Sequence, residues 1–344
     1  MTACLLSSAA GFEPRGLPLA VTRSALALAE LTTLVFTADH DLFTYEPSLP
    51  GGMRCYGAHR LSLWCIAGSG PNGMLVSRMV AIAVLVVTAS GYRPRWTCVP
   101  QWFVTWSLTT GMTLPNGGDE AALVTTMLLV PVLLGDTRAW HWARPRKALA
   151  PVWAGSSYAA WCAIRCQTAI IYLSAALSKL RTPQWRDGTA LYSVLVDPDY
   201  GLPLAVRSSL SPITTSGAVV GALTWSVLGV ELAIAVCALS RRGARRAAGW
   251  LAVALHGGIA AAMGLFSFGL TMVALVLSLR FDDRASPSAP VTGPARSRRE
   301  APPERCPPPG REPSRPRFRI HSPACGTTAD KESRCPSTSD PWIH

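Results

Sequence analysis

Residues 160–180 read AWCAIRCQTAIIYLSAALSKL, an apolar run whose two charged side chains are Arg165 and Lys179. At 1.5 Å per residue, a helix of about 20 residues crosses about 30 Å of hydrocarbon. The run is part of a longer apolar stretch, residues 152–180. We therefore predict a membrane-spanning helix at this position.

Apolar stretches of similar length recur along most of the chain. They cover approximately residues 20–38, 74–92, 97–114, 119–135 and 213–239. A further stretch, 249–281, would extend for about 50 Å as one helix, which is too long for a single crossing. Two short crossings broken near Gly264 fit it better. The sequence therefore predicts an all-α, polytopic transmembrane helix bundle of about eight spans within residues 1–281.

The composition excludes an ordinary soluble protein. Of the 344 residues, 49% are hydrophobic and 15% are charged, whereas about 25% of residues are charged in soluble domains. Residues 282–344 differ from the rest, because they are rich in proline and arginine and have no periodic apolar pattern. We expect them to form a disordered tail. Acidic residues are interspersed with the basic ones, so no nucleic-acid partner is expected.

Basic residues cluster in alternate connections between the predicted spans, which the positive-inside rule assigns to the cytoplasm. These clusters are Arg15 with Arg23, Arg93 with Arg95, Arg138 to Lys147, and Arg241 to Arg246. With eight spans, the N-terminus and the tail both lie on the cytoplasmic side. We expect no secretory signal peptide, because Glu13 and Arg15 interrupt the apolar residues near the start.

The ten cysteines do not form a zinc-binding pattern, and we predict no metal site. Cys55 and Cys65 lie together in the first connection that we predict to face outside. An oxidising exterior permits a disulfide between them, and two free thiols are the alternative. The sequence alone leaves both open.

Three polar residues form a stripe along the span at 152–180. Arg165, Tyr172 and Lys179 follow one another at spacings of seven, which places them on one face of a helix. Such a stripe should face the interior of a bundle. Lys179 has two interpretations: it extends its ammonium to the headgroups without a chemical role, or it is partly desolvated and acts as a base. The spacing does not separate them.

Other ionisable residues also lie in or beside predicted spans. Glu231 is in the middle of VLGVELAIAVCAL, and His256 is in the middle of the apolar run that begins at Trp250. Each is either a hydrogen-bond partner between helices or part of a reactive site. Our hypothesis is that Arg165 pairs with Glu231. Asp119 follows Gly-Gly and is expected to be a helix N-cap.

Several segments together carry a resemblance to a known family. They are GYRPR (91–95), LPNGGDE (114–120), IIYLSAALSKLRTPQWRDGTALY (170–192) and LHGGIAAAMGLFSFGLTMVAL (255–275). Over roughly residues 15–281 the chain resembles the horizontally transferred transmembrane (HTTM) domain shared with vitamin K-dependent gamma-carboxylases. Within that superfamily it is most similar to the bacterial sporulation-delaying protein B group. The resemblance thus implies a multi-pass protein of the bacterial plasma membrane.

The resemblance implies a catalytic lysine. In the carboxylases the proposed base is a lysine seven positions after a tyrosine, followed by a leucine and then by tryptophan and glycine. Residues Tyr172, Lys179, Leu180, Trp185 and Gly188 match this run, although one extra residue separates the leucine from the tryptophan. The lysine is thought to deprotonate a reduced quinone, which would be the cofactor here.

Further residues of the implied site lie on both sides of this run. Asp187 belongs to the Trp-x-Asp-Gly sequence, and His256 with Phe266 matches a His-to-Phe motif of the family. We therefore take Lys179, Tyr172 and His256 as candidate catalytic residues. The supporting polar residues are Arg165, Glu231, Trp185 and Asp187.

The carboxylases have a large folded domain after the membrane part, and this chain has the tail at 282–344 instead. We therefore do not expect a full carboxylase. The sporulation-delaying protein B group is implied to mature an exported antimicrobial toxin peptide, together with a small partner protein. Our leading hypothesis is that role, with the lipid bilayer and a precursor peptide as partners. The alternatives are a quinone-linked, carboxylase-like enzyme with Lys179 as base, and a non-catalytic channel, transporter or scaffold.

Overall fold

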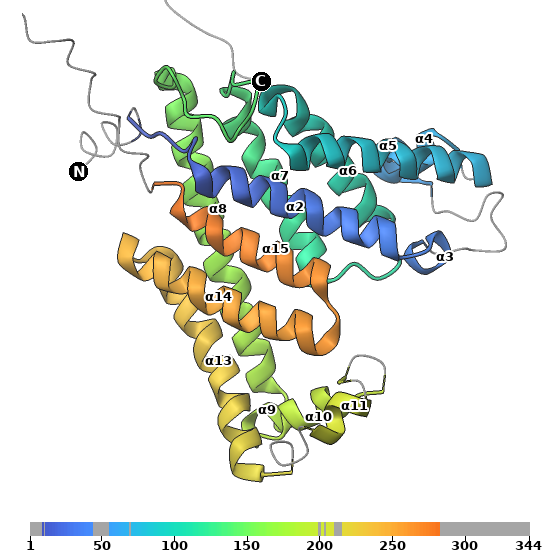
Figure 1. Cartoon of the computed structure of the whole chain (residues 1–344), viewed down its shortest axis with the longest axis vertical. Helices are drawn as coiled ribbons and strands as arrows, with labels where there is room; N and C mark the ends of the chain where they lie inside the picture. Colours follow the sequence, from blue (N-terminus) through green and yellow to red (C-terminus); the bar gives the residue numbers. More distant parts are fainter. Residues whose placement is uncertain are drawn as a thin grey trace, which may run out of the picture. The chain divides into compact units, whose positions relative to one another are not determined.

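A computed structural model of the chain describes residues 9, 11–43, 55–68, 70–198, 201–202, 204–209 and 215–282. Eight helices of 12 to 31 residues dominate this part, and short helices lie between them (Figure 1). The long helices are α2 (Leu17–Phe36), α5 (Pro71–Ser90), α6 (Pro94–Gly111), α7 (Gly117–Leu134), α8 (Pro151–Arg181), α13 (Gly217–Leu239), α14 (Arg242–Met263) and α15 (Phe266–Leu277). The short ones are α3 (Asp39–Leu42), η1 (Gly57–Leu61), α4 (Leu63–Ile66), α9 (Pro183–Arg186), α10 (Ala190–Val196), α11 (Leu204–Ser209) and η2 (Ser278–Arg280).

The predicted all-α class is confirmed. Among the described residues, five helices are long and apolar enough to cross a membrane: α2, α5, α7, α8 and α13. The chain turns sharply between α14 and α15 at Gly264, whose φ of 69° is left-handed, so the predicted break there is also confirmed. The total of eight crossings stays a prediction, because α15 is short and α14 begins with basic residues. The predicted tail lies outside the described residues from position 283 onward.

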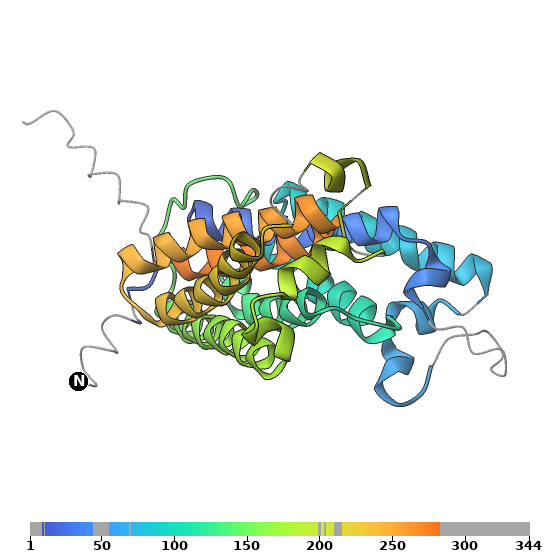
Figure 2. The same cartoon turned by 90° about the horizontal axis from the view of Figure 1, so that it is seen from below.

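Helix α2 lies at the centre of the packing, because it contacts α5 on one side and α15 on the other. α15 in turn packs against α14 and α7, and α8 packs against α7 and α13. In Figure 1, α8 and α13 run down the page, whereas α2, α14 and α15 cross it. Seen from below in Figure 2, α14 and α15 lie along one side and α8 along the other.

Prolines and one capping box set the starts of several helices. Pro71, Pro94 and Pro151 occupy the first turns of α5, α6 and α8, where a missing N–H costs no hydrogen bond. The N-cap of α7 is Asn116, whose side chain accepts from the backbone N–H of Asp119, and the Asp119 carboxylate accepts from the N–H of Asn116. Our prediction that Asp119 itself is the N-cap was therefore wrong. The aspartate is the third residue of a capping box.

Backbone contacts bring alternate connections together at the two ends of the helices. At one end, the Arg93 N–H donates to the Ala139 carbonyl, and the His141 N–H donates to the Gly91 carbonyl. At the other end, the Thr113 N–H donates to the carbonyl of Leu42. The connections that we predict to be cytoplasmic thus meet each other, as the alternating basic clusters require.

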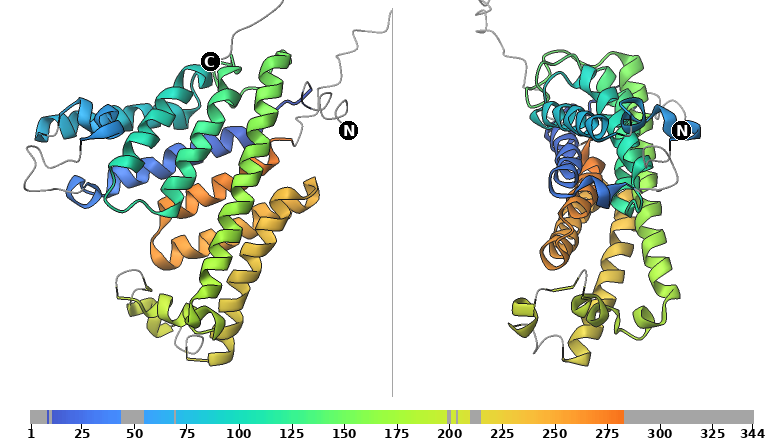
Figure 3. Two further views of the ribbon diagram at one scale, coloured as in Figure 1. Left: turned by 180° about the vertical axis from the view of Figure 1, so that it is seen from behind. Right: turned by 90° about the vertical axis from the view of Figure 1, so that its right-hand side faces the viewer.

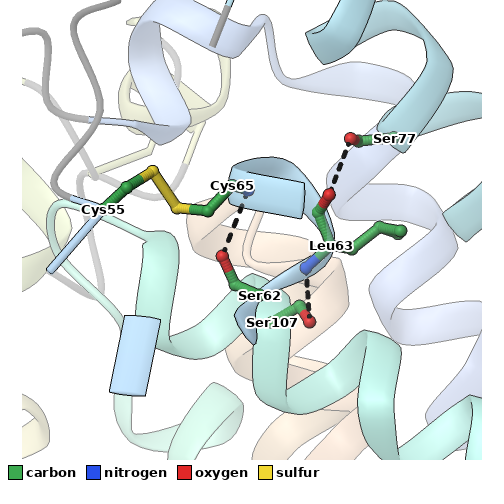
Figure 4. Close-up of a disulfide and its surroundings, with 6 residues drawn as sticks. All are labelled: Cys55, Ser62, Leu63, Cys65, Ser77 and Ser107. Atoms are coloured by element: carbon green, nitrogen blue, oxygen red, sulfur yellow. Dashed lines mark hydrogen bonds between the residues drawn. A yellow bond between two sulfur atoms is a disulfide. The ribbon is translucent and has the colours of Figure 1, made fainter. Parts of the chain in front are cut away.

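A disulfide closes residues 55–65, which precede α5 in the chain, at the second end (Figure 4). Cys55 and Cys65 are bonded, which decides between the two alternatives that the sequence left open. Leu63, at the start of α4, donates its N–H to the Ser107 hydroxyl, and its carbonyl accepts from the Ser77 hydroxyl. The disulfide-bonded segment is therefore attached to both α5 and α6.

Candidate functional site

Near its C-terminal end, α8 is joined to α13 by an ion pair. The ammonium of Lys179 donates to Glu231 Oε1 at 2.7 Å. The Glu231 side chain is 8% exposed and that of Lys179 is 26% exposed. A carboxylate in apolar surroundings is costly unless a cation or hydrogen bonds compensate it. The pair with Lys179 explains how an otherwise apolar span tolerates Glu231.

Two turns earlier, α8 contacts α14 through Tyr172. The Tyr172 hydroxyl lies 2.7 Å from Nε2 of His256, and both side chains are buried. The hydroxyl donates when Nε2 is the unprotonated ring nitrogen. The His256 ring also packs edge-on against Phe268 of α15, with ring centroids 5.5 Å apart. Four helices therefore meet around the two pairs.

A glycine permits this close packing of α15 on α14. A Cβ atom at Gly269 would lie 2.9 Å from the carbonyl oxygen of His256. A larger residue would push the two helices apart, because Cβ atoms do not approach oxygen that closely. Gly269 thus helps to bring Phe268 against the His256 ring.

The two pairs form one polar site inside an apolar bundle. Tyr172 and Lys179 are about 10 Å apart along α8. Within the part of the chain that the structure describes, Glu231 Oε2 and His256 Nδ1 are buried without a hydrogen-bond partner. These two atoms are available to hydrogen-bond a ligand.

The segment after α8 lies over the Lys179 end of the site. The Thr182 N–H donates to the Lys179 carbonyl, and α9 follows directly. The Lys179 ammonium then lies 5.5 Å from the centroid of the Trp185 ring, within the range of a cation–π interaction. Trp185 is therefore a direct neighbour of the lysine, and its supporting role stays a prediction.

This segment then folds back onto α13. Gly188 has a φ of 77°, and a Cβ there would lie 3.1 Å from the Gly221 Cα atom, so the turn needs a glycine. The Leu191 N–H donates to the hydroxyl of Thr224 on α13. Asp187 is exposed on this turn, outside the buried site. Figure 3 shows from behind how α8 and α13 run together to α9 and α10.

Comparison with known proteins gives the family. The sporulation-delaying protein SdpB of Bacillus subtilis (strain 168) is 30% identical over 259 residues, which cover 75% of this chain and 79% of SdpB. The chain belongs to the SdpB family. The B. subtilis protein YitO is also similar to it, with 32% identity over 260 residues that cover 75% of this chain and 82% of YitO. No family model and no solved structure matches the chain.

Membership of the SdpB family confirms the group that the sequence motifs indicated. Together with the five apolar helices, it identifies the chain as a multi-pass membrane protein. The broader likeness to the HTTM domain of gamma-carboxylases stays a prediction.

Arg165 does not belong to the site around Lys179. Its Nε donates to the carbonyl of Ala238, and its guanidinium lies over the ring of Trp161, 4.7 Å from the centroid. Our hypothesis that Arg165 pairs with Glu231 was therefore wrong, and Lys179 is the partner. Arg165 instead binds the C-terminal end of α13, where free carbonyls favour a cation. A spacing of seven places residues on one helix face but does not say which level of the neighbouring helix each one meets.

One feature of the site was missing from the sequence prediction. The aromatic neighbour of His256 is Phe268, whereas Phe266, the residue of the family motif, is largely exposed. The turn at Gly264 determines which of the two phenylalanines faces α14. Outside the site, Glu30 of α2 is a second buried carboxylate: its Oε1 accepts a hydrogen bond from the Thr105 hydroxyl of α6 at 2.6 Å, and its Oε2 is buried without a hydrogen-bond partner.

Proposed function

We propose that this chain helps to convert an exported precursor peptide into an active antimicrobial toxin at the membrane. The observation that carries the proposal is the ion pair between partly exposed Lys179 and buried Glu231 in a member of the SdpB family. Glu231 Oε2 is buried without a hydrogen-bond partner beside a partly exposed ammonium, so a peptide that reaches Lys179 also meets a free acceptor.

The Lys179 end of the site is where the precursor would bind. Lys179 keeps 26% of its side chain exposed, so a peptide can reach its ammonium. Glu231 Oε2 can accept a hydrogen bond from a peptide N–H, while the Lys179 ammonium donates to a peptide carbonyl or carboxylate. Trp185 forms an apolar wall beside them.

This proposal includes an orientation in the plasma membrane. The N-terminus and the tail are cytoplasmic, and the disulfide, Trp185 and the Lys179 end face outside. The basic clusters at one end and the disulfide at the other support this arrangement. The outside is also where an exported precursor and a small partner protein would meet the site. An enzymatic reporter fused after residue 300 tests the orientation: activity outside the cell would contradict it.

The test replaces each member of the ion pair in a toxin-producing host. Lys179→Met and Glu231→Gln should each reduce the amount of mature toxin at least tenfold, measured by mass spectrometry of the medium. Lys179→Arg keeps the positive charge, so partial production is expected. Arg181→Met is the matched control, because Arg181 is an exposed cation at the end of the same helix.

Membrane levels of each variant, measured by immunoblot, separate loss of function from loss of protein. The proposal fails if Lys179→Met and Glu231→Gln accumulate normally and still yield as much toxin as the Arg181→Met control. In that case the polar residues only satisfy one another, and the channel, transporter or scaffold alternative is favoured.

A carboxylase-like enzyme is the second candidate, favoured by the same unpartnered atoms. Glu231 and His256 would hold a reduced quinone, because Glu231 Oε2 and His256 Nδ1 are buried atoms that can accept a hydrogen bond from a hydroxyl group. For Nδ1 to accept, Nε2 must carry the ring proton and donate to the Tyr172 oxygen. When bound, a reduced quinone supplies the reducing equivalents for oxygen chemistry. For Lys179 to act as a base, its extra proton must first pass to an acceptor, and Glu231 is the acceptor in contact.

An absorbance measurement distinguishes the second candidate from the first. Purified wild-type protein should change the ultraviolet spectrum of an added reduced quinone, and Lys179→Met should abolish the change. If the spectra with wild type, with Lys179→Met and with no protein coincide while toxin production still depends on Lys179, the maturation role stands and the quinone role does not.

A further inference from the structure

A pocket of about 200 Å³ opens at the end of the helices opposite to Lys179. One wall is the start of α2, with Arg15 and Gly16. The other wall is the connection between α7 and α8, which contributes Arg138, His141 and Arg144. This basic pocket is separate from the site around Lys179, because α8 begins beside it and carries Lys179 at its far end.

Two of the three arginines in the basic pocket are neutralised and fixed in place. Arg15 binds the carboxylate of Glu13, with Nε 2.7 Å from Oε1, and its Nη2 also donates to the Lys147 carbonyl. Arg138 binds the carboxylate of Asp136, with Nη2 2.7 Å from Oδ2, and bridges to the Arg15 carbonyl. These bonds hold the two walls together without leaving an excess of charge.

Arg144 gives the basic pocket its excess of positive charge. It is exposed, and among the described residues it forms no ion pair with a carboxylate. Its neighbours along the chain, Arg146 and Lys147, are also exposed cations. The mouth of the basic pocket is therefore positively charged, whereas its floor is neutralised.

A second uncompensated cation lies behind the wall of the basic pocket. Arg23 of α2 is fully buried, donates to the Thr97 hydroxyl and lies 3.4 Å from His141 Nδ1, and its Nε has no hydrogen-bond partner. Burial, together with the charges of Arg23 and Arg138, lowers the pKa of His141 to about 3. His141 is thus neutral at physiological pH, and it adds no positive charge of its own to the basic pocket.

The backbone of α2 adds to this potential. Gly16 is the N-cap of α2 and forms no side-chain capping hydrogen bond, so the start of the helix at Gly16 and Leu17 lies at the pocket uncapped, although Pro18 in this turn has no N–H. The start of a helix of 20 residues carries a partial positive charge that favours phosphate. Arg144 and the helix end therefore approach one small volume from different sides.

Aromatic residues place the basic pocket at the level of the membrane surface. Trp142 lines it, and Trp140 and Trp96 lie close by at the same end of the helices. All three are about half exposed or more. Tryptophan concentrates where hydrocarbon meets headgroups, so a phosphate at this depth is a lipid headgroup or a soluble phosphate compound from the adjoining aqueous phase.

We propose that the basic pocket binds a phosphate group, carried by an anionic phospholipid or by a soluble phosphate compound, with Arg144 as the residue that contacts it. Basic pockets at the ends of membrane helices are suited to such headgroups, because charge-assisted hydrogen bonds to phosphate form there at low cost in solvation. Arg15 and Arg138 hold the walls at the right separation.

The experiment uses the purified full chain in detergent. Native mass spectrometry measures binding of phosphatidylglycerol against phosphatidylcholine, and thermal unfolding measures the effect of inorganic phosphate against chloride at equal ionic strength. We expect wild type to prefer phosphatidylglycerol, and Arg144→Gln to weaken that binding about tenfold, since a hydrogen bond to a charged group is lost. Arg95→Gln is the matched control: Arg95 is exposed at the same end but does not line the basic pocket.

The possible results distinguish a lipid ligand, a soluble phosphate ligand and the absence of a specific site. Arg144-dependent binding of phosphatidylglycerol supports a lipid ligand, and Arg144-dependent stabilisation by inorganic phosphate without lipid preference supports a soluble one. Equal losses in Arg144→Gln and Arg95→Gln would show diffuse surface attraction and overturn the proposal. So would a wild-type protein that neither prefers the anionic lipid nor is stabilised by phosphate. Arg144 is exposed, so its replacement should leave folding intact.

Discussion

The Lys179–Glu231 pair should contribute measurably to the stability of the protein in detergent. Two unit charges whose atoms are 2.7 Å apart attract each other by about 6 kcal/mol at an effective dielectric constant of about 20. Desolvation of the two groups offsets a large part of this, and the lysine is 26% exposed. We therefore expect a coupling free energy of about 1–3 kcal/mol.

A double-mutant cycle measures this coupling. Lys179→Met, Glu231→Gln and the double variant are compared with wild type by unfolding in mixed detergent micelles. Each single variant should lose about 2–3 kcal/mol, because it leaves a charged or polar group without its partner. The double variant should lose less than the sum of the two. Arg181→Met, which removes an exposed cation from the same helix, should change the free energy of unfolding by less than about 0.5 kcal/mol. A coupling free energy between Lys179 and Glu231 below about 0.5 kcal/mol would refute the idea that the ion pair stabilises Glu231 within the span.

Three further predictions follow from the packing, the disulfide and a buried histidine. Gly269→Ala should lower the free energy of unfolding by about 1–3 kcal/mol in the same assay, since its Cβ would lie 2.9 Å from a carbonyl oxygen of α14. The control is Gly258→Ala, whose Cβ would meet nothing within 4 Å, and it should be neutral or stabilising. Equal effects of the two substitutions would contradict the close approach of α15 to α14. Cys55 and Cys65 should resist maleimide labelling in intact cells until a reductant is added, and reduction should lower stability by about 2–3 kcal/mol; immediate labelling would exclude the disulfide. The pKa of His141 is about 3 in the folded protein against an ordinary value of 6.5, so the unfolded state takes up a proton first as the pH falls. The free energy of unfolding should therefore decrease as the pH drops below about 6.5. His141→Gln should remove this pH dependence, and an unchanged pH dependence would assign it to other groups.

The positions of the helices were predictable from the sequence because each depends on local signals. Apolar length places the spans, prolines occupy the first turns of α5, α6 and α8, and Gly264 breaks the last stretch in two. These properties belong to short segments, so no knowledge of the neighbouring helices is needed. The start of α7 was predicted three residues too late. Asn116 and Asp119 are both good N-cap residues, and two hydrogen bonds between their side chains and backbone N–H groups make Asn116 the N-cap.

The partners within the site were less predictable, because they depend on how far one helix is shifted along another. Tyr172, Lys179 and Glu231 were all candidates, yet the sequence pointed to Arg165 as the partner of Glu231. Lys179 is the partner because α13 runs antiparallel to α8, so that the middle of α13 meets the last turns of α8. Arg165 then falls beside the C-terminal end of α13. No spacing within a single helix contains this information.

The two connections between α8 and α13 are separated by 14 residues on α8 but by 7 residues on α13, from Glu231 to Ala238. Arg165 binds the end of α13 at Ala238, and Lys179 binds its middle at Glu231, and the two contacts are separated by 14 residues on α8, about 21 Å. Two contacts at different levels oppose sliding and rotation of one helix against the other, so α8 and α13 should move as one unit. If a peptide binds at Glu231 as we propose, the motion that admits it should carry both helices together relative to α14, to which the hydrogen bond between Tyr172 and His256 joins α8.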